Sequence, residues 1–257
     1  MNGGRGGSGT TPRVSVIIPA RNDAAALRQT LDWLCGLPGM DQVEVIVAAS
    51  GDPRGTARAV SGRAKLLWPE DSTRGALMNA GARVARAPIL FFLHADSCPP
   101  VNAFELICQR LSDTCVVGGA FEHLFAESGW SLRVISKINR IRYRLTGNYY
   151  GDQGIFVRAC TFRQLGGYRD LRILEDLDFS RRLRRAGRTG LICVALRTSG
   201  RRFLARGPWR TFLFIVWLLL LHTLGFDTER YAELWRGPAD RLPGHPWRKR
   251  DSRAAAR

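Results

Sequence analysis

The sequence predicts an α/β protein whose mostly parallel sheet is covered by helices on both faces. Short apolar, β-branched runs alternate with segments of helical periodicity through the first half of the chain. These strand-like runs contain almost no polar residues, which is typical of parallel strands buried on both faces. With 257 residues, 45% of them apolar, the chain is long enough for one such domain and is not globally disordered.

The first half is predicted to form a β-α-β-α-β-α-β series. The first strand is stopped by Pro19, and Asp23 opens the helix that follows, which ends near Gly36. The predicted strands are 14–18, 43–47, 65–67 and 88–93, and the predicted helices are 23–36, a short one near residue 57, and 74–86. Because ligands bind beyond the carboxyl ends of parallel strands, residues 20–23, 48–52 and 94–96 are expected to border the crevice.

The second half is less regular. Strands are predicted at 116–125, 154–157 and 191–195, with a basic helix at 132–145 and an amphipathic helix at 175–186. Residues 212–221 form an uninterrupted apolar run, shorter than the roughly 18 to 20 residues that span a bilayer. This run either packs on the core or lies in a membrane interface, where Trp209 and Trp217 would favour the headgroup boundary.

The predicted organisation is a flexible leader, a catalytic domain, a basic segment with apolar helices, and a basic tail. Their boundaries are 1–13, 14–198, 199–236 and 237–257. The net charge of +17 is concentrated in the last third, where 179–210 contains arginines and no acidic residue. Such a patch suits an anionic partner, which could be phospholipid, nucleotide diphosphate or nucleic acid, although arginines on solvated faces are the alternative. Apart from Trp209 the patch lacks interleaved aromatic residues, so no nucleic-acid partner is expected.

The expected location is the cytoplasm, with possible peripheral binding to the inner face of the membrane. The Gly-rich beginning has no apolar stretch typical of a signal peptide. The six cysteines include no CxxC pair and are interpreted as buried free thiols of a reducing compartment.

Two acidic clusters are candidates for chemistry. Asp96 follows a buried strand, where its carboxylate could hold a divalent cation together with a diphosphate, or could merely cap a following helix. Glu175, Asp176 and Asp178 begin a helix, so they are either acids stabilised by the helix dipole or include a general base.

Two polar segments are weaker candidates. The loop 150–154 is Gly-flanked and, taken alone, is an ordinary turn. Arg201 and Arg202, with Arg206 and Trp209, suit contact with phosphate or a membrane interface, or else form a solvated basic linker.

Together these segments resemble the family 2 glycosyltransferases of the GT-A fold. The resemblance covers about 14–235 and rests on motifs that occur in the family's order. They are VSVIIPARND, VEVIVAASGDPRGT, STRGALMNAGARVARAPILFFLHAD, YGDQGIFVR, ILEDLDFSRRLRRAG and TSGRRFLARGPWRTFL. They look like a compact bacterial subfamily associated with arsenosugar biosynthesis or radical-SAM gene clusters.

The resemblance implies a GT-A sheet, a nucleotide-sugar donor with UDP as the default nucleotide, and Mg²⁺ or Mn²⁺ as cofactor. Asp96 would bind the metal, and Asp176 would be the catalytic base, with Glu175 as the second choice. The residues implied for the nucleotide or donor are Pro19, Arg21, Asn22, Asp23, Ser50, Asp52, Arg74, Asn79, His94 and Ala95. Those implied for the sugar or acceptor are Asp152, Gln153, Arg201, Arg202 and Trp209.

The chain departs from the family at two positions. Ala49 stands where the family usually has an acid that holds the base or ribose, and His94 replaces the first acid of the metal motif. The expected reaction is inverting transfer to an unknown acceptor by direct displacement, with Asp176 taking the acceptor proton. The alternative is a nucleotide-binding or scaffold protein that has this fold but no turnover.

Overall fold

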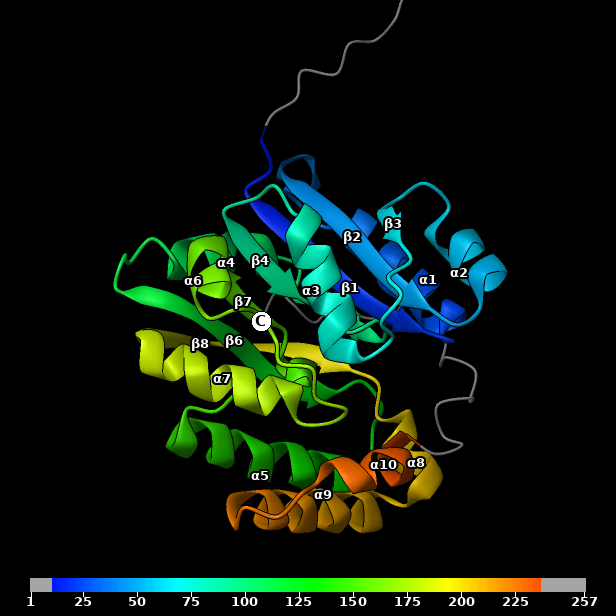
Figure 1. The fold of residues 1–257 in the computed structure, drawn as a ribbon, viewed down its shortest axis with the longest axis vertical. Helices are drawn as coiled ribbons and strands as arrows, with labels where there is room; N and C mark the ends of the chain where they lie inside the picture. Colours follow the sequence, from blue (N-terminus) through cyan, green and yellow to red (C-terminus); the bar gives the residue numbers. More distant parts are fainter. Residues whose placement is uncertain (1–10, 237–257) are drawn as a thin grey trace, which may run out of the picture.

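The computed structural model describes residues 11–236, and within them the strands form one eight-stranded sheet (Figure 1). The predicted tail, 237–257, and most of the predicted leader lie outside the described residues. The sheet order is β3-β2-β1-β4-β7-β6-β8-β5. The strands are β1 (Val14–Arg21), β2 (Val43–Ser50), β3 (Lys65–Leu67), β4 (Ile89–Phe92), β5 (Ser97–Cys98), β6 (Val116–Phe125), β7 (Ile155–Arg158) and β8 (Arg188–Thr198).

Most neighbouring strands run in the same direction, as predicted. β1 pairs in parallel with β2 and β4, and β2 with β3, while β6 pairs in parallel with β8. β7 is antiparallel to β4 and β6, and β5 is antiparallel to β8. Because β1 and β4 end at the same edge of the sheet, residues 20–23 and 94–96 are brought together there.

Helices cover both faces of the sheet. One apolar cluster joins β1 to α1 (Ala24–Cys35), α2 (Pro53–Val60) and α4 (Ala103–Arg110). A second joins the other face to α3 (Arg74–Val84), α6 (Ala159–Gln164) and α7 (Glu175–Ala186). β1 serves both, because Val16 and Ile18 belong to the first cluster and Ile17 to the second. Short 3₁₀ turns are η1 (Met40–Gln42), η2 (Gly151–Gln153) and η3 (Glu229–Tyr231).

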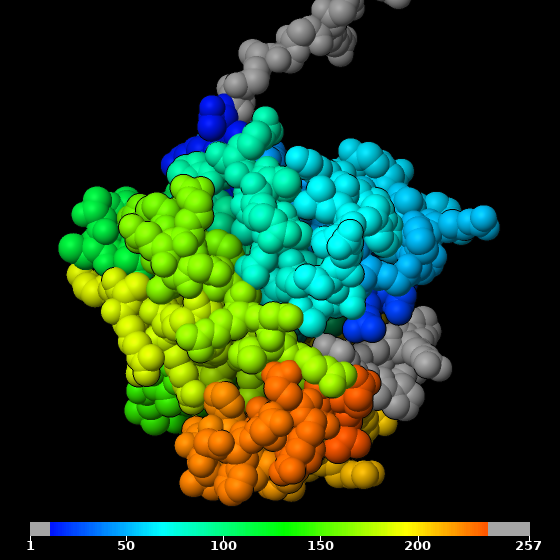
Figure 2. All heavy atoms as spheres, viewed as in Figure 1, coloured from blue at the N-terminus to red at the C-terminus, as the bar shows by residue number. Residues whose placement is uncertain are grey.

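The remaining helices gather at one end of the molecule. They are α5 (Trp130–Thr146), α8 (Arg201–Arg206), α9 (Pro208–Thr223) and α10 (Ala232–Arg236). α9 lies along α5 in Figure 1, and Figure 2 shows α9 in orange on the lower surface. Phe212 packs with Phe125 and Leu132, and Leu218 packs with Ile173. Among residues 11–236, no helix has both the length and the apolarity needed to cross a membrane.

The structure corrects several local expectations. The last predicted strand, 191–195, is the middle of the longer β8, and the short elements β5, α4 and α6 were not predicted. Asp96 is followed by strand β5, so the interpretation of this residue as a helix cap is wrong. The expectation of buried thiols holds for Cys98, whereas four of the free cysteines are exposed. These are Cys35, Cys115, Cys160 and Cys193.

Candidate active site

A cavity of about 780 Å³ opens where β1 and β4 end and continues toward α8, α9 and α10. Polar side chains line it beside the strand ends, and aromatic and aliphatic side chains of α8 and α9 line much of the rest, with Arg201, Arg202 and Glu233 among them. The predicted site residues that line it are Pro19, Arg21, Asn22, Asp23, Arg74, His94, Ala95, Asp96, Asp152, Asp176, Arg201 and Arg202. Residues far apart in the sequence therefore meet in one cavity, as a crevice at the strand ends requires.

The two candidate bases have different surroundings. Glu175 is 1% exposed, does not line the cavity, and forms an ion pair with Nε of Arg74. Asp176 lines the cavity, and its Oδ2 accepts a hydrogen bond from the Gly151 N–H at 2.7 Å. Its Oδ1 accepts from the Leu177 N–H at 2.8 Å, so both carboxylate oxygens are held in place.

The acids at the start of α7 do not cap it in the usual way. The N-cap position is Leu174, in the left-handed region at φ 60°, and no side chain caps the helix there. Burial raises the pKa of Glu175 above its usual value, and Arg74 opposes that rise. Glu175 therefore positions the Arg74 guanidinium, which also lies 3.7 Å from Oδ2 of Asp176.

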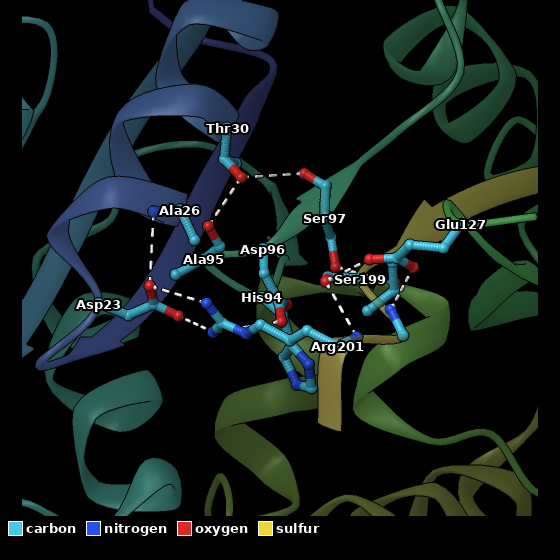
Figure 3. A network of polar contacts seen from close by, with 12 residues as sticks. Asp23, Ala26, Thr30, His94, Ala95, Asp96, Ser97, Glu127, Ser199 and Arg201 are labelled. Carbon is cyan, nitrogen blue, oxygen red and sulfur yellow. Dashed lines mark hydrogen bonds and ion pairs between the residues drawn. The ribbon is translucent and has the colours of Figure 1, made fainter. Parts of the chain in front are cut away.

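A second polar network connects three segments across the cavity (Figure 3). Arg201, on the first turn of α8, donates from both terminal nitrogens to the carboxylate of Asp23, one of these bonds being 3.1 Å long. The same guanidinium is 3.7 Å from Oδ2 of Asp96. The turn before α8 is fixed because Ser199 Oγ and the Gly200 N–H both donate to Glu127. Arg201 and Arg202 of the basic segment therefore line the cavity, whereas Arg206 and Trp209 do not.

His94 is a neutral acceptor in this arrangement. Burial, together with the charges of Arg74 and Arg202, lowers the pKa of His94 well below its usual value. Its Nε2 lies 3.3 Å from a terminal nitrogen of Arg74, and a guanidinium can only donate, so Nε2 carries the lone pair. A Cβ on Gly151 would come within 2.5 Å of that Nε2, so only glycine fits beside His94.

The site also contains a residue that the sequence did not suggest. His123, on β6, lines the cavity, is 2% exposed, and has no hydrogen-bond partner on either ring nitrogen among the described residues. Its Nε2 lies 3.6 Å from Oδ2 of Asp152, whose Oδ1 also has no partner there. Burial lowers the pKa of His123, and the Asp152 charge opposes this. These polar atoms can be satisfied by a hydroxyl-rich ligand.

Other predicted residues lie outside the cavity lining. Both amide atoms of Asn79 bond to the backbone of Tyr168, at 2.8 and 2.9 Å. Asp52 caps α2 by accepting from the Arg54 and Gly55 N–H groups.

Gln153, also outside the lining, is buried and donates to the Phe121 carbonyl, so it fixes the loop 150–154. Ser50 and Trp209 do not line the cavity either. Ala49 is fully buried in the core cluster beneath α1 and α2, away from the crevice.

The surroundings of Asp96 fit a cation that is held mainly by the phosphates of a bound molecule and by water, with one carboxylate from the protein. Among residues 11–236 no group of three or more His, Cys, Asp or Glu side chains is placed to chelate an ion. The Asp96 carboxylate is 22% exposed and lines the cavity. Burial raises its pKa to about 6, a cost that a nearby cation would remove. One carboxylate with phosphate oxygens and waters is a normal set for Mg²⁺ or Mn²⁺.

Comparison with solved structures identifies similar folds. The mannosyltransferase PcManGT from Pyrobaculum calidifontis, in complex with GDP-Man and Mn²⁺, is 20% identical with a TM-score of 0.60, covering 90% of this chain and 74% of that one. S. aureus TarS 1–349 in complex with UDP-GlcNAc is 14% identical with a TM-score of 0.57, covering 74% and 59%. The chain spans 37% of the longer TarS structure. At these identities the likeness establishes the fold.

Sequence comparison establishes the family. No curated protein matches the chain. The model of a family described as "Glycosyl transferase family 2" matches residues 15–165, more than half of the chain. This match includes β1 to β4, the Asp96 strand end and the 150–154 loop. With the GT-A sheet, it shows that the chain belongs to glycosyl transferase family 2.

Proposed function

We propose that this family 2 chain transfers a sugar from a nucleoside-diphosphate donor to an acceptor hydroxyl, with inversion at the anomeric carbon. The observation that carries the proposal is that Asp96, Asp176 and the Arg74 guanidinium share one cavity lining. The guanidinium suits a diphosphate, and a carboxylate can accept a proton. The structures of similar fold contain GDP-Man and UDP-GlcNAc, so both nucleotide classes belong in a donor screen, with UDP as the default.

The donor is proposed to lie along the ends of β1 and β4. Pro19, Arg21 and Asn22 border the nucleotide, while Arg74 approaches its phosphates. Asn22 Oδ1 accepts from the Asp52 N–H at 2.9 Å, which joins the residues that follow β1 to those that follow β2. Asp152 faces the sugar or the acceptor, and His123 beside it adds unsatisfied polar atoms for their hydroxyls.

Mg²⁺ or Mn²⁺ is the proposed cofactor, with Asp96 as its protein ligand. A bound divalent cation would supply charge neutralisation to the leaving diphosphate. Nε2 of His94 already accepts from Arg74, so Asp96 is the side chain of this motif that offers oxygen to the ion. The Mn²⁺ in PcManGT, a protein of similar fold, supports this choice.

Asp176 is the proposed base. The acceptor oxygen attacks the anomeric carbon, the bond from that carbon to the diphosphate oxygen breaks, and the acceptor proton passes to the Asp176 carboxylate. The Gly151 and Leu177 N–H groups keep this carboxylate oriented toward the cavity during the attack. Glu175 keeps Arg74 in place through their ion pair.

Nucleoside diphosphate release from a panel of UDP- and GDP-sugars tests this function. The purified full chain is expected to release product with Mn²⁺ and not with EDTA. Asp96→Asn should lower turnover on the order of a hundredfold or more, because charge stabilisation of the leaving group is lost. Asp41→Asn, an exposed acid far from the cavity, is the matched control. Full activity of Asp96→Asn or in EDTA would contradict the metal role.

A nucleotide-binding or scaffold protein without turnover is the alternative, and the apolar setting of Ala49 is the observation that favours it. It predicts that a donor binds, and raises the melting temperature, while no product forms from any donor of the panel.

A cytoplasmic location with peripheral membrane binding also belongs to the proposal. Trp209 and Arg210 are exposed at the start of α9, where indoles and cations favour an anionic interface. Vesicle binding that requires anionic lipid and weakens with salt is the expected result.

A further inference from the structure

α9 has apolar side chains on both of its sides. Phe212, Ile215 and Leu219 line the cavity, while Leu213 and Leu220 are exposed on the outside. Its neighbours add to each side, with Phe214 and Leu218 also in the lining, and with Val216 and Trp217 also exposed. A single helix therefore separates an apolar cavity wall from an apolar outer surface.

α5 extends that outer surface. It exposes large apolar side chains at helical spacing, and it lies along α9 (Figure 1). These side chains are Trp130, Val134, Ile138, Ile141 and Leu145. The Trp130 ring lies 5.8 Å from that of Trp209 between ring centroids, which joins the two helices into one continuous face. Exposed apolar surfaces of this extent mark an interaction site.

Basic residues lie on the same two helices as this α5–α9 face. Arg133 and Lys137 are exposed on α5, and Arg210 is exposed on α9. Arg140 and Arg144 pair with Glu122 at 3.0 and 2.5 Å and are also on the α5 side of the molecule. Apolar and indole side chains framed by cations complement the surface of an anionic bilayer.

The cavity, like the outer surface, combines polar and apolar side chains. The part beside the strand ends has the proposed base Asp176 and the unsatisfied polar atoms of His123 and Asp152. The part beside the last helices is formed mainly by Phe203 and the inner side of α9, and it also includes the ion pair of Arg172 with Glu233. A ligand that fills both parts must have a polar end and an apolar end.

We propose that the acceptor is an amphiphilic membrane lipid that enters the cavity along α9 while the α5–α9 face lies on an anionic bilayer. The lipid's polar head reaches Asp176, and its hydrocarbon chain contacts Phe212, Ile215 and Leu219. This proposal rests on the proposed glycosyl transfer and names the class of its acceptor.

The docking face is tested by flotation with vesicles of phosphatidylglycerol and phosphatidylcholine, mixed equally, against vesicles of phosphatidylcholine alone. The wild-type chain is expected to float with the mixed vesicles, and less at high salt. The double variant Trp130→Ser/Trp217→Ser should bind about tenfold more weakly, because both indoles are exposed on the face. Trp68→Ser, an exposed indole elsewhere, should bind like the wild type. Equal binding of all three proteins, or none, overturns the docking.

Entry of the lipid is tested with a photoreactive probe, a phosphatidylglycerol bearing a diazirine on one acyl chain, placed in the same vesicles. Labelled positions are read by peptide mass spectrometry. We expect labels on the inner residues Phe212, Ile215 and Leu219 as well as on the outer residues. Ile215→Trp should fill the cavity wall and reduce inner labelling several-fold, whereas Val216→Trp, its exposed neighbour, should not. If Ile215→Trp does not fold, Leu219→Trp replaces it.

Donor hydrolysis in the absence of lipid separates the two proposals. Labelling confined to the outer residues, with donor hydrolysis intact, overturns the lipid acceptor and leaves the glycosyltransferase standing. Inner labelling in a protein that hydrolyses no donor refutes the glycosyltransferase, and the acceptor assignment fails with it.

Discussion

Glu175 and Asp176 are adjacent carboxylates with different surroundings, and the roles proposed for them predict that their amide variants fail in different ways. Asp176 lines the cavity with both oxygens held by backbone N–H groups, whereas Glu175 is buried against Arg74 outside the lining. Asp176→Asn removes proton acceptance; its amide oxygen can still accept from Gly151, while the bond from the Leu177 N–H is lost because an NH2 group cannot accept. We expect kcat to fall by about 10²- to 10⁴-fold with the donor Kd nearly unchanged.

Glu175→Gln should act on donor binding. It replaces a charged partner of Arg74 by a neutral one, and hydrogen bonds to charged groups contribute about 1.5–3 kcal/mol. The Arg74 guanidinium would then be held less firmly in place. If the whole of that free energy is lost from donor binding, the donor Kd rises about 10- to 100-fold. Because burial raises the pKa of Glu175, its ionised form is costly in the fold, and we expect the neutral variant to lose little stability.

The assay measures donor Kd by calorimetry and kcat by nucleoside diphosphate release for both variants. Asp178→Asn is the control, since this acid of the same helical turn pairs with Arg169 and Arg182 and does not line the cavity. It should keep both parameters. If Glu175→Gln abolishes kcat at unchanged Kd while Asp176→Asn stays active, the assignment of the base is wrong. If all three variants stay active, the acids only stabilise the helix.

Three further predictions concern stability and packing. The raised pKa of Asp96, about 6 against 3.8, means that its favourable contribution to stability is present below pH 3.8 and is lost as pH rises through 6. Asp96→Asn should therefore raise the free energy of unfolding at pH 8 by up to about 3 kcal/mol, with little change at pH 3.5, in urea titrations with EDTA; no gain at pH 8 would contradict this. Asn79→Leu should cost about 1–3 kcal/mol by leaving the Tyr168 backbone unpaired, with donor Kd unchanged; weaker donor binding at full stability would instead support its implied nucleotide role. Gly151→Ala should lower kcat about tenfold or more in a folded protein, because its Cβ meets His94; wild-type kcat would show that the loop has room.

Much of the fold could be predicted because local patterns and burial agree in its first half. The runs that predicted strands at 14–18 and 43–47 are β-branched and apolar, and both strands lie inside the sheet with helices on each face. Asp96 could be placed at the crevice for the same reason, because a polar residue directly after a buried strand must lie at its carboxyl end. Periodicity missed the short elements β5, α4 and α6, because two to eight residues are too few to show a repeat.

For some polar residues the sequence could not show whether the side chain faces the cavity, because tertiary contacts decide this. His123 lies within the mainly apolar run of β6, where nothing local distinguishes a core histidine from one that faces a cavity. Asn79 belongs to the same helix as Arg74, but the backbone of Tyr168 occupies its amide, a contact between residues far apart in the chain. The order of the motifs suggests a nucleotide role for both Arg74 and Asn79. Only the packing of α3 against 168–175 shows that Arg74 lines the cavity and Asn79 does not.

The apolar run at 212–221 shows where sequence reasoning reaches its limit. A helix without a polar side gives no periodicity, so pattern alone could not choose between core packing and an interface. In the structure one side of α9 closes the cavity, whereas the other side is exposed beside α5, so binding of that side to a membrane interface stays a prediction. The position of Arg201 also depends on tertiary packing. Its side chain reaches Asp23 only because α8, which begins at Arg201, lies against the residues that follow β1. The C-terminal segment therefore completes the cavity, and a truncation after 198 should remove one of its walls and a cation beside Asp96.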